Sequence, residues 1–339
     1  MTGASSDMDG HTKGGAVNQR LTWSGKPILT WGALVVMLVS SLVMAMARDA
    51  SATFSGRNGR IAFSSDRGGE DLEIYTMRPQ GGDVVQVTSA PGNSIFSDWH
   101  PDGRRIVFDS DRVTRGCSDE ACNVEIFITN VDGTGLRRLT RSPSFDGDPS
   151  VSLDGKRIAF GSDRDGDPEI YTMRLDGTHV RQVTHNNWSD FNPSWSPNGR
   201  RLAFESDAGR GGGRSAVFTI HTDGSHLRRI TPWPLNAGVA DWAPGGARLA
   251  FATNSQIPRP SKIYTVKADG SELRRITNPH GEDSDFFPSW SPDGRRITFT
   301  RFTEDNVDVY AMGRAGRHIS RLTRAPAFDL APDWGSVPN

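Results

Sequence analysis

The chain lacks several features that common catalytic and nucleic-acid-binding classes require. Its 339 residues contain no Gly-x-Ser-x-Gly nucleophile elbow and no α/β segment to carry one, which argues against a serine hydrolase. The formal net charge is −1, which argues against a nucleic-acid or anionic-membrane surface as the main partner. No stretch after residue 50 keeps a helical period, so the sequence predicts an all-β protein.

Cysteine is almost absent. The two that occur, Cys117 and Cys122, lie in one loop that lengthens the segment around it. In an oxidising compartment such a pair predicts a local disulfide, which stiffens one hairpin more than it stabilises the whole fold. A redox-active or metal-binding pair is the alternative, although the spacing fits neither chemistry.

A segment of about forty-five residues occurs six times, and this repeat decides the predicted architecture. Each copy reads aromatic, Ser-Pro-Asp-Gly, Arg-Arg-Ile-Ala-Phe, Ser-Asp, an Ile-Tyr strand, a second Gly turn and a Thr. Three landmarks align the copies: a first-strand aromatic, a Phe that ends the second strand and a Thr that ends the unit. They are Trp99, Trp195, Trp242, Trp290 and Trp334, with Val151 in the third copy; Phe63, Phe108, Phe160, Phe204, Phe251 and Phe299; and Thr88, Thr140, Thr184, Thr231, Thr277 and Thr323.

Each unit is predicted to be a four-stranded antiparallel meander. The Pro-Asp-Gly step supplies a fixed φ and then a Gly that tolerates positive φ, which is typical of a hairpin turn. The runs between turns are β-branched and aromatic and too short for helices. A second Asp-Gly turn, as at 132–133 and 176–177, precedes the last strand.

The two ends of the repeat region predict how the repeats close. The region begins at residue 58 inside the second strand of a unit, and it ends at 332–335 with a first strand. Together the two fragments make one complete unit. Pairing them closes a ring and leaves no exposed terminal edge, so the sequence predicts a closed six-bladed β-propeller over residues 58–335.

The N-terminal part differs from the repeats in composition. Residues 1–27 are polar and Gly-rich, and we expect them to be disordered. Residues 28–47 are almost wholly apolar and long enough for a membrane-spanning helix, so they predict a signal sequence or a retained anchor. Basic residues before this run predict an extracytoplasmic propeller, periplasmic or at the cell surface. Residues 48–57 are expected to be a linker and 336–339 a tail.

The repeat resembles the repeats of the TolB β-propeller family. The resemblance rests on Trp-Ser-Pro-Asp-Gly-Arg-Arg-Ile-Ala-Phe, Ser-Asp-Arg, Glu-Ile-Tyr, Asp-Gly and Arg-Arg-Leu-Thr, and it covers residues 58–334. It implies a non-catalytic interaction platform in the bacterial cell envelope. TolB itself carries an α/β domain ahead of the propeller, for which residues 48–58 leave no room. A partner inherited from TolB therefore does not follow.

Two acidic positions stand out when the repeats are aligned on the first-strand aromatic. Because this strand is usually innermost, we expect the connection entering it to open onto the channel. Carboxylates there, with neighbouring aromatics, would attract a cation or a Lys- or Arg-bearing partner segment. The alternative is that each Asp caps its own tight turn. The candidates are Asp146, Asp190, Asp285 and Asp329 five residues before the aromatic; Asp98, Asp241 and Asp333 one residue before it; and Phe191, Phe286 and Phe287.

A weaker metal candidate lies in the third repeat. Asp163, Asp165 and Asp167 alternate like the carboxylates of a calcium loop, but the Gly and Glu of such a loop are missing. A polar hairpin is the alternative. Three of the eight histidines, His179, His226 and His318, occupy equivalent turns of different repeats and lie far apart in a ring, so the sequence indicates no cofactor other than calcium at this loop.

The sequence therefore predicts an extracytoplasmic, monomeric propeller that binds an envelope protein or peptide without catalysis. If residues 28–47 are not cleaved, they also attach it to the membrane. One alternative is a metal-dependent propeller enzyme, a lyase or hydrolase acting on a carbohydrate or lactone. The other is the ectodomain of an envelope sensor.

Overall fold

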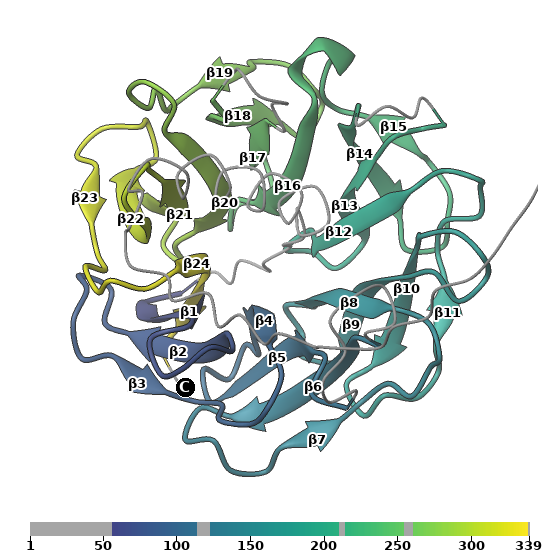
Figure 1. Ribbon diagram of the computed structural model, residues 1–339. Helices are drawn as coiled ribbons and strands as arrows, with labels where there is room; N and C mark the ends of the chain where they lie inside the picture. The colour runs from purple at the N-terminus through teal and green to yellow at the C-terminus, as the bar shows by residue number, and fades with distance from the viewer. Residues whose placement is uncertain (1–55, 114–122, 210–213, 254–259, 338–339) are drawn as a thin grey trace, which may run out of the picture.

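The computed structural model describes residues 56–113, 123–209, 214–253 and 260–337. These residues form six four-stranded antiparallel sheets arranged around a centre, which is a six-bladed propeller (Figure 1). The all-β prediction and the predicted number of blades are confirmed. The predicted N-terminal helix at 28–47 and the predicted disulfide between Cys117 and Cys122 lie outside the described residues.

Each blade is a meander whose strands are counted outward from the centre. Blade 1 contains β24 (Asp329–Ser336), β1 (Asn58–Ser65), β2 (Glu73–Met77) and β3 (Val85–Gln86). Blade 2 contains β4 (Ser94–Trp99), β5 (Arg105–Ser110), β6 (Glu125–Asn130) and β7 (Arg137–Arg138). Blade 3 contains β8 (Asp146–Val151), β9 (Arg157–Ser162), β10 (Glu169–Arg174) and β11 (Arg181–Gln182).

The second half of the ring repeats this order. Blade 4 contains β12 (Asp190–Trp195), β13 (Arg201–Ser206), β14 (Ala216–His221) and β15 (Arg228–Arg229). Blade 5 contains β16 (Ala237–Trp242), β17 (Arg248–Thr253), β18 (Ile263–Lys267) and β19 (Arg274–Arg275), and the 3-10 turn η1 (Trp233–Leu235) precedes it. Blade 6 contains β20 (Ser284–Trp290), β21 (Arg296–Phe302), β22 (Val307–Gly313) and β23 (Ser320–Arg321).

The ring closes within blade 1, as the sequence predicted. The last strand, β24, pairs antiparallel with the first strand of the chain, β1, with Ile61 opposite Trp334 and Ala62 opposite Asp333. β1 thereby becomes an interior strand between β24 and β2, and β24 supplies the innermost strand of the blade, so the ring is closed by strand pairing.

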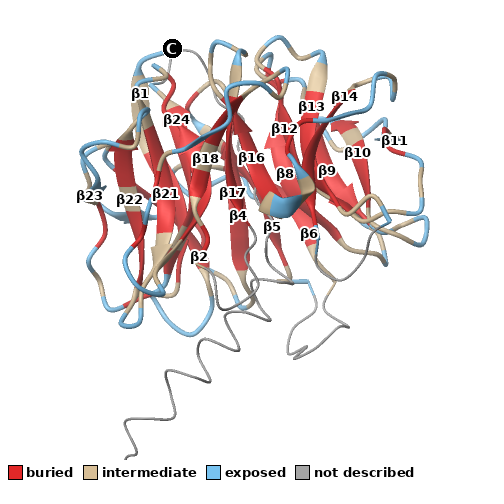
Figure 2. Ribbon diagram, turned by 90° about the horizontal axis from the view of Figure 1, so that it is seen from above, coloured by how far each residue is buried: buried red, intermediate tan, exposed pale blue. Residues whose placement is uncertain are grey.

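The core lies between the blades. The six Phe landmarks at the ends of the second strands are buried, and the five first-strand Trp residues are also buried. Each Trp packs against side chains of a neighbouring blade, as when Trp99 joins Ala62 and Ile74 of blade 1. Because burying one such side chain contributes roughly 1.5–3 kcal/mol, this inter-blade packing is the main source of stability. Figure 2 shows the buried strands between two layers of exposed loops.

The propeller has two faces. The turn face carries the hairpin turns between strands one and two and between strands three and four of each blade. These two turns touch within a blade, as shown by the bond from the Arg314 backbone N–H to the Arg295 carbonyl oxygen at 2.9 Å. The loop face carries the loops between strands two and three and the connections into the next blade. There the Phe145 backbone N–H donates to Asp163 Oδ1 at 2.9 Å.

Each innermost strand contains a bulge at the same position. The residue three before the first-strand aromatic has positive φ in all six blades, although none of these residues is Gly; they are Phe96, Asp148, Asn192, Val239, Phe287 and Ala331. The pairing register with the second strand shifts at this point. Phe96, Val239, Phe287 and Ala331 belong to one buried cluster, so apolar side chains from four blades meet at the centre.

Candidate binding face

The acidic position directly before the first-strand aromatic connects neighbouring blades. Asp98 Oδ2 accepts the backbone N–H of Val151 at 2.7 Å, Asp241 Oδ2 that of Trp290 at 2.7 Å, and Asp333 Oδ2 that of Trp99 at 2.9 Å. In the other blades serine takes the position, and Ser289 accepts the N–H of Trp334 at 3.2 Å. These carboxylates are buried.

This placement corrects the expectation that Asp98, Asp241 and Asp333 line an open mouth. The carboxylates turn away from the channel because the backbone N–H of the next inner strand is otherwise buried without a partner. The three bonds given above cross to the next blade rather than capping the residue's own turn, although Asp333 also bonds the backbone N–H of Trp334. The position therefore links the blades.

Asp98 and Asp333 also interact with each other. Burial raises the pKa of Asp333 to about 6, opposed by the Trp99 N–H and by a side-chain hydrogen bond with Asp98. Two carboxyl groups can share such a bond only when one of them holds a proton. The joint between blades 1 and 2 therefore contains a protonated carboxyl at mildly acidic pH.

The acidic position that opens the first strand is neutralised within its own blade. Arg164 lies 2.6 Å from Asp146, Arg301 lies 2.7 Å from Asp285 and Arg67 lies 2.6 Å from Asp329. Asp146, Asp285 and Asp329 are three of the four carboxylates predicted at this position of the channel mouth, and all three are fully buried. Here too the structure corrects the expectation, because a carboxylate without a cation in such a position carries a large desolvation cost.

The arginines that hold these carboxylates lie over aromatic pairs. The Arg164 guanidinium lies 5.3 Å from the Phe160 ring and 4.9 Å from the Tyr171 ring. Arg67 and Arg112 occupy the corresponding places in blades 1 and 2. Cation–π contact and ion pairing thus fix the guanidinium between a ring stack and an acid. We call this arrangement the arginine clamp.

Blades 3 and 4 meet at the corner where the arginine clamp is missing. Asp190 is buried like its counterparts, but Ala208 stands where Arg67, Arg112 and Arg164 stand in other blades. Asp190 is held by neutral side chains instead: Asn186 Nδ2 donates to Asp190 Oδ2 at 2.9 Å, and Ser206 and Thr184 also hydrogen-bond it. Burial raises the pKa of Asp190.

A second carboxyl at this corner also lacks the arginine of its counterparts. Glu125 in blade 2 is paired with Arg138, and Asp308 in blade 6 lies 2.6 Å from Arg321. Glu73 in blade 1 faces Gln86 at this place, but Arg112 of the next blade lies 4.0 Å from it. In blade 3 the corresponding pair is Glu169 and Gln182, and the Gln182 amide donates to Asp165 instead. Burial raises the pKa of Glu169 to about 7.

Glu169 and Asp190 share a side-chain hydrogen bond, which requires that one of them holds a proton, and Asn186 contacts both. The backbone N–H of Asn186 donates to Glu169 Oε1 at 2.5 Å, while its side chain bonds Asp190. Neither carboxyl has an ion pair with a described residue. The corner therefore holds two neighbouring buried carboxyl groups and no cation from the described residues.

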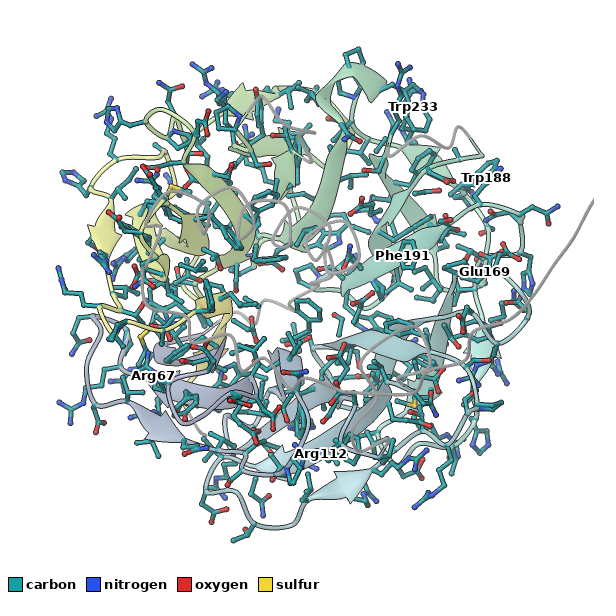
Figure 3. The ribbon with its side chains drawn as sticks, viewed as in Figure 1. Arg67, Arg112, Glu169, Trp188, Phe191 and Trp233 are labelled. Carbon is teal, nitrogen blue, oxygen red and sulfur yellow. The ribbon has the colours of Figure 1, made fainter. Side chains whose placement is uncertain are left out.

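Aromatic side chains surround this corner on the loop face. Trp188, Phe191 and Trp233 are partly exposed. A Cβ placed on Gly209 would lie 3.0 Å from Trp188, so the indole rests on that glycine. Trp233 packs edge-on against Phe218 at 6.0 Å. Figure 3 shows these three residues and Glu169 in one sector, away from Arg67 and Arg112.

Of the three aromatic residues predicted for the site, only Phe191 is partly exposed and able to contact a partner. Phe286 and Phe287 are buried in the central cluster, where Phe287 is the bulge residue of β20. Sequence reasoning did not include Trp233. The signal was present in Pro232-Trp233-Pro234, a short break in the connection between repeats, which forms η1.

The loop face is acidic. Its exposed and partly exposed carboxylates are Asp66, Glu70, Asp71, Asp111, Asp163, Asp165, Asp167, Asp207, Glu282, Asp283, Glu304 and Asp305. The basic side chains of the same described loops are Arg67, Arg112, Arg141, Arg164, Arg214, Lys262 and Arg324. Carboxylates therefore outnumber cations there, and Arg67 and Arg164 are already bound to buried acids.

The candidate calcium loop does not gather its carboxylates. Asp163 accepts the N–H of Phe145, and Asp165 accepts the amide of Gln182. The described residues contain no group of three or more His, Cys, Asp or Glu side chains that could hold a metal ion, and this includes Asp167. Within the same described residues, no helix is both long and apolar enough to cross a membrane.

Comparison with known proteins agrees with this geometry. A family model described as the TolB beta propeller domain matches residues 116–282. The Tol-Pal system protein TolB of Nitratidesulfovibrio vulgaris is 26% identical over 141 residues, which are 31% of this chain and 32% of that protein. The chain spans about a third or less of the length of the curated relatives it matches.

Solved structures show the same fold. TolB from Acinetobacter baumannii superimposes with a TM-score of 0.68 at 21% identity, covering 82% of this chain and 67% of that one. A putative TolB from Agrobacterium tumefaciens gives a TM-score of 0.60 at 19% identity, covering 84% of this chain and all of that one (100%).

Proposed function

The chain is a TolB-like six-bladed propeller, and from this premise we propose that it is a non-catalytic, extracytoplasmic platform that binds a basic segment of an envelope protein. The observation that carries the proposal is the corner between blades 3 and 4. There Glu169 and Asp190 lack the arginine that their counterparts have, beside partly exposed aromatic side chains.

The electrostatics of this corner favour a cationic side chain. In the other blades an arginine of the chain itself neutralises the equivalent carboxyl, as Arg164 does for Asp146. A Lys or Arg of a partner can approach Glu169 and Asp190 from the loop face and supply the missing charge. The surrounding acidic loops increase the rate at which such a segment arrives.

The aromatic side chains supply the remaining contact area. Trp188, Phe191 and Trp233 are large, rigid and partly exposed, and such residues dominate the energetics of protein interfaces. Trp188 lies against Gly209 and Trp233 against Phe218, so neither ring has to be ordered on binding. We therefore propose a preformed site for a short segment with a Lys or Arg and an apolar neighbour.

Site-specific photo-crosslinking tests this proposal. A photo-reactive phenylalanine analogue replaces Phe191 in the full chain, expressed in its own host, and crosslinked partners are identified by mass spectrometry. The matched control places the same analogue at Leu227, an exposed apolar residue beside β15.

We expect one partner to crosslink at Phe191 and not at Leu227, through a peptide that contains Lys or Arg. Adding Asp165→Asn and Asp167→Asn, which weaken the acidic field without touching the core, should reduce the yield several-fold. Equal crosslinking at both positions would contradict the proposal, and so would a partner whose crosslinked peptide is acidic.

A further inference from the structure

The turn of blade 6 departs from its counterparts. In blades 2 to 5 the turn between strands three and four contains an Asp whose carboxylate accepts the backbone N–H and the hydroxyl of a Thr or Ser two residues later, as Asp176 does for Thr178 at 2.9 and 2.6 Å. In blade 6 Ala315 replaces the Asp and Arg317 replaces the Thr or Ser. Arg314 stands where blades 2 to 5 have Val, Leu, Thr and Ala.

This departure removes a local stabilising contact and adds positive charge. An Asp that caps a turn stabilises it by satisfying backbone and hydroxyl donors. Neither new arginine replaces that contact, since Arg314 and Arg317 are exposed and make no ion pair with a described residue. The folded structure therefore gives no internal reason for the two charges.

Two further exposed arginines lie at the same corner. Arg295 belongs to the adjacent turn, whose backbone carbonyl accepts the N–H of Arg314 at 2.9 Å. Arg57 belongs to the segment entering blade 1, where the Gly56 N–H donates to the Pro292 carbonyl oxygen at 3.1 Å. We call Arg57, Arg295, Arg314 and Arg317 the basic corner. The carboxylate in these turns, Asp293, is bound by Ser291 and by the backbone N–H of Arg295.

The position of this corner identifies its partner. The chain enters the propeller at Arg57, on the turn face, and the apolar run 28–47 ends about ten residues earlier in the sequence. Ten residues reach at most about 35 Å. If the run is inserted in a membrane, as its composition predicts, this corner lies close to the lipid surface. A basic corner tethered to the membrane needs little intrinsic affinity for lipid, because tethering raises the effective concentration of headgroups around it.

We propose that the basic corner docks on anionic phospholipid headgroups. The ligand is the headgroup phosphate of the leaflet from which the chain emerges, bound by arginines that form bidentate bonds with phosphate oxygens. Docking of the turn face directs the loop face away from the membrane.

Hydrogen–deuterium exchange of the full chain in lipid nanodiscs tests the docking. One set of nanodiscs contains phosphatidylcholine alone, and the other contains about 30 mol% phosphatidylglycerol. Because both sets carry the same uncleaved chain, only headgroup charge differs. We expect peptides covering 292–296 and 313–318 to exchange several-fold more slowly in the anionic discs, and about 0.5 M NaCl should abolish the difference.

Two double variants complete the experiment. Arg314→Gln with Arg317→Gln should remove the lipid-dependent protection at 292–296. Arg274→Gln with Arg275→Gln, which deletes two exposed arginines from β19 of the neighbouring blade, should leave it unchanged. Equal exchange in both lipids overturns the proposal without any variant, and an equal effect of the two double variants also overturns it, because a general charge effect would then suffice.

Discussion

The arginines of the two faces have different structural roles although they lie at opposite ends of the same strands. On the loop face, Arg67, Arg164 and Arg301 follow or end the second strand and lie within ion-pair distance of a fully buried carboxylate. On the turn face, Arg157 and Arg201 begin the second strand. They cover a Trp of the next blade, with the guanidinium 4.3 Å from Trp195 and 4.9 Å from Trp242.

This difference shows which arginines the fold depends on. A loop-face arginine offsets the desolvation of a buried charge, so its loss leaves the carboxylate without a compensating cation. A turn-face arginine covers an aromatic ring that packing already holds, and its own head group reaches water. Where the next blade has no Trp in its first strand, the turn-face arginine contacts a different residue. Arg105 faces the blade with Val151 and bonds Asp102 at 2.9 Å.

Removing a loop-face arginine should have the largest effect. Arg301→Ala leaves Asp285 buried and unpaired, and we expect it to lower the free energy of unfolding by about 3 kcal/mol, the cost of breaking a buried ion pair. Urea denaturation followed by Trp fluorescence measures the change. The double variant with Asp285→Asn should recover part of the loss; no recovery would show that Arg301 acts through packing on Phe299 and Tyr310 rather than through charge.

Asp98 and Asp333 are buried carboxyl groups that bond each other, so in this pair a proton rather than an arginine compensates the buried charge. Folding raises the pKa of Asp333 from 3.8 to about 6, so the folded state holds this proton more tightly than the unfolded chain. The resulting stability is fully present below about pH 4 and is lost as the pH rises to about 6. Asp333→Asn keeps an acceptor for Trp99 and a donor for Asp98, so this loss should disappear.

We expect the variant to be more stable than the parent at pH 7 by on the order of 1–3 kcal/mol, since one pKa unit corresponds to about 1.4 kcal/mol. Thermal melts between pH 4 and pH 8 measure the two slopes. Parallel slopes in parent and variant would show that other groups cause the pH dependence. The next variant to test would then be Glu205→Gln, because burial raises the pKa of Glu205 to about 7.

Restoring an arginine at the corner between blades 3 and 4 should have a smaller effect on stability. Gln182→Arg places a cation opposite Glu169, as Arg138 lies opposite Glu125. We expect the pKa of Glu169 to fall and stability at pH 8 to rise by about 1 kcal/mol. If a basic segment binds this corner, the same substitution should weaken its binding several-fold. Isothermal titration with Lys- and Arg-containing peptides measures this, and Gln86→Arg in blade 1 is the matched control.

Removing a turn-face arginine should have the smallest effect. Arg157→Ala loses the contact with Trp195 and a hydrogen bond to the Gly199 carbonyl, and we expect a loss of about 1 kcal/mol or less. Urea denaturation beside Arg301→Ala compares the two faces directly. A loss as large as that of Arg301→Ala would remove the distinction drawn between them.

Sequence periodicity alone predicted the blades, their number and the closure. The Trp, Phe and Thr landmarks recur in register, and a ring is what satisfies the incomplete units at both ends, because an unpaired strand edge is unfavourable. The bulge before each first-strand aromatic was not predictable. Its positive-φ residues range from Asp148 to Phe287, so no residue type marks the position.

The candidate site was predicted only in part. Alignment identified Asp146, Asp190, Asp285 and Asp329 as equivalent, which they are, but it placed them in a solvated mouth. The ion pairs that neutralise three of them join residues from different strands, and their burial depends on the neighbouring blade. The distinguishing residue, Ala208 in place of arginine, is visible in the sequence. Its importance depends on the arginines that lie beside the acids in the other blades, and only the tertiary structure shows those contacts.

By itself, the sequence determined the repeat, the all-β class, the ring and the near-zero net charge, because each follows from local residue type and periodicity. Only the tertiary structure decided where the charges lie. The meander sends turns with exposed arginines to one face and carboxylate-rich loops to the other, so a chain of net charge −1 has two faces of opposite character. A sum over the sequence cannot show this, because electrostatic interaction depends on distance and burial rather than on the order of residues along the chain.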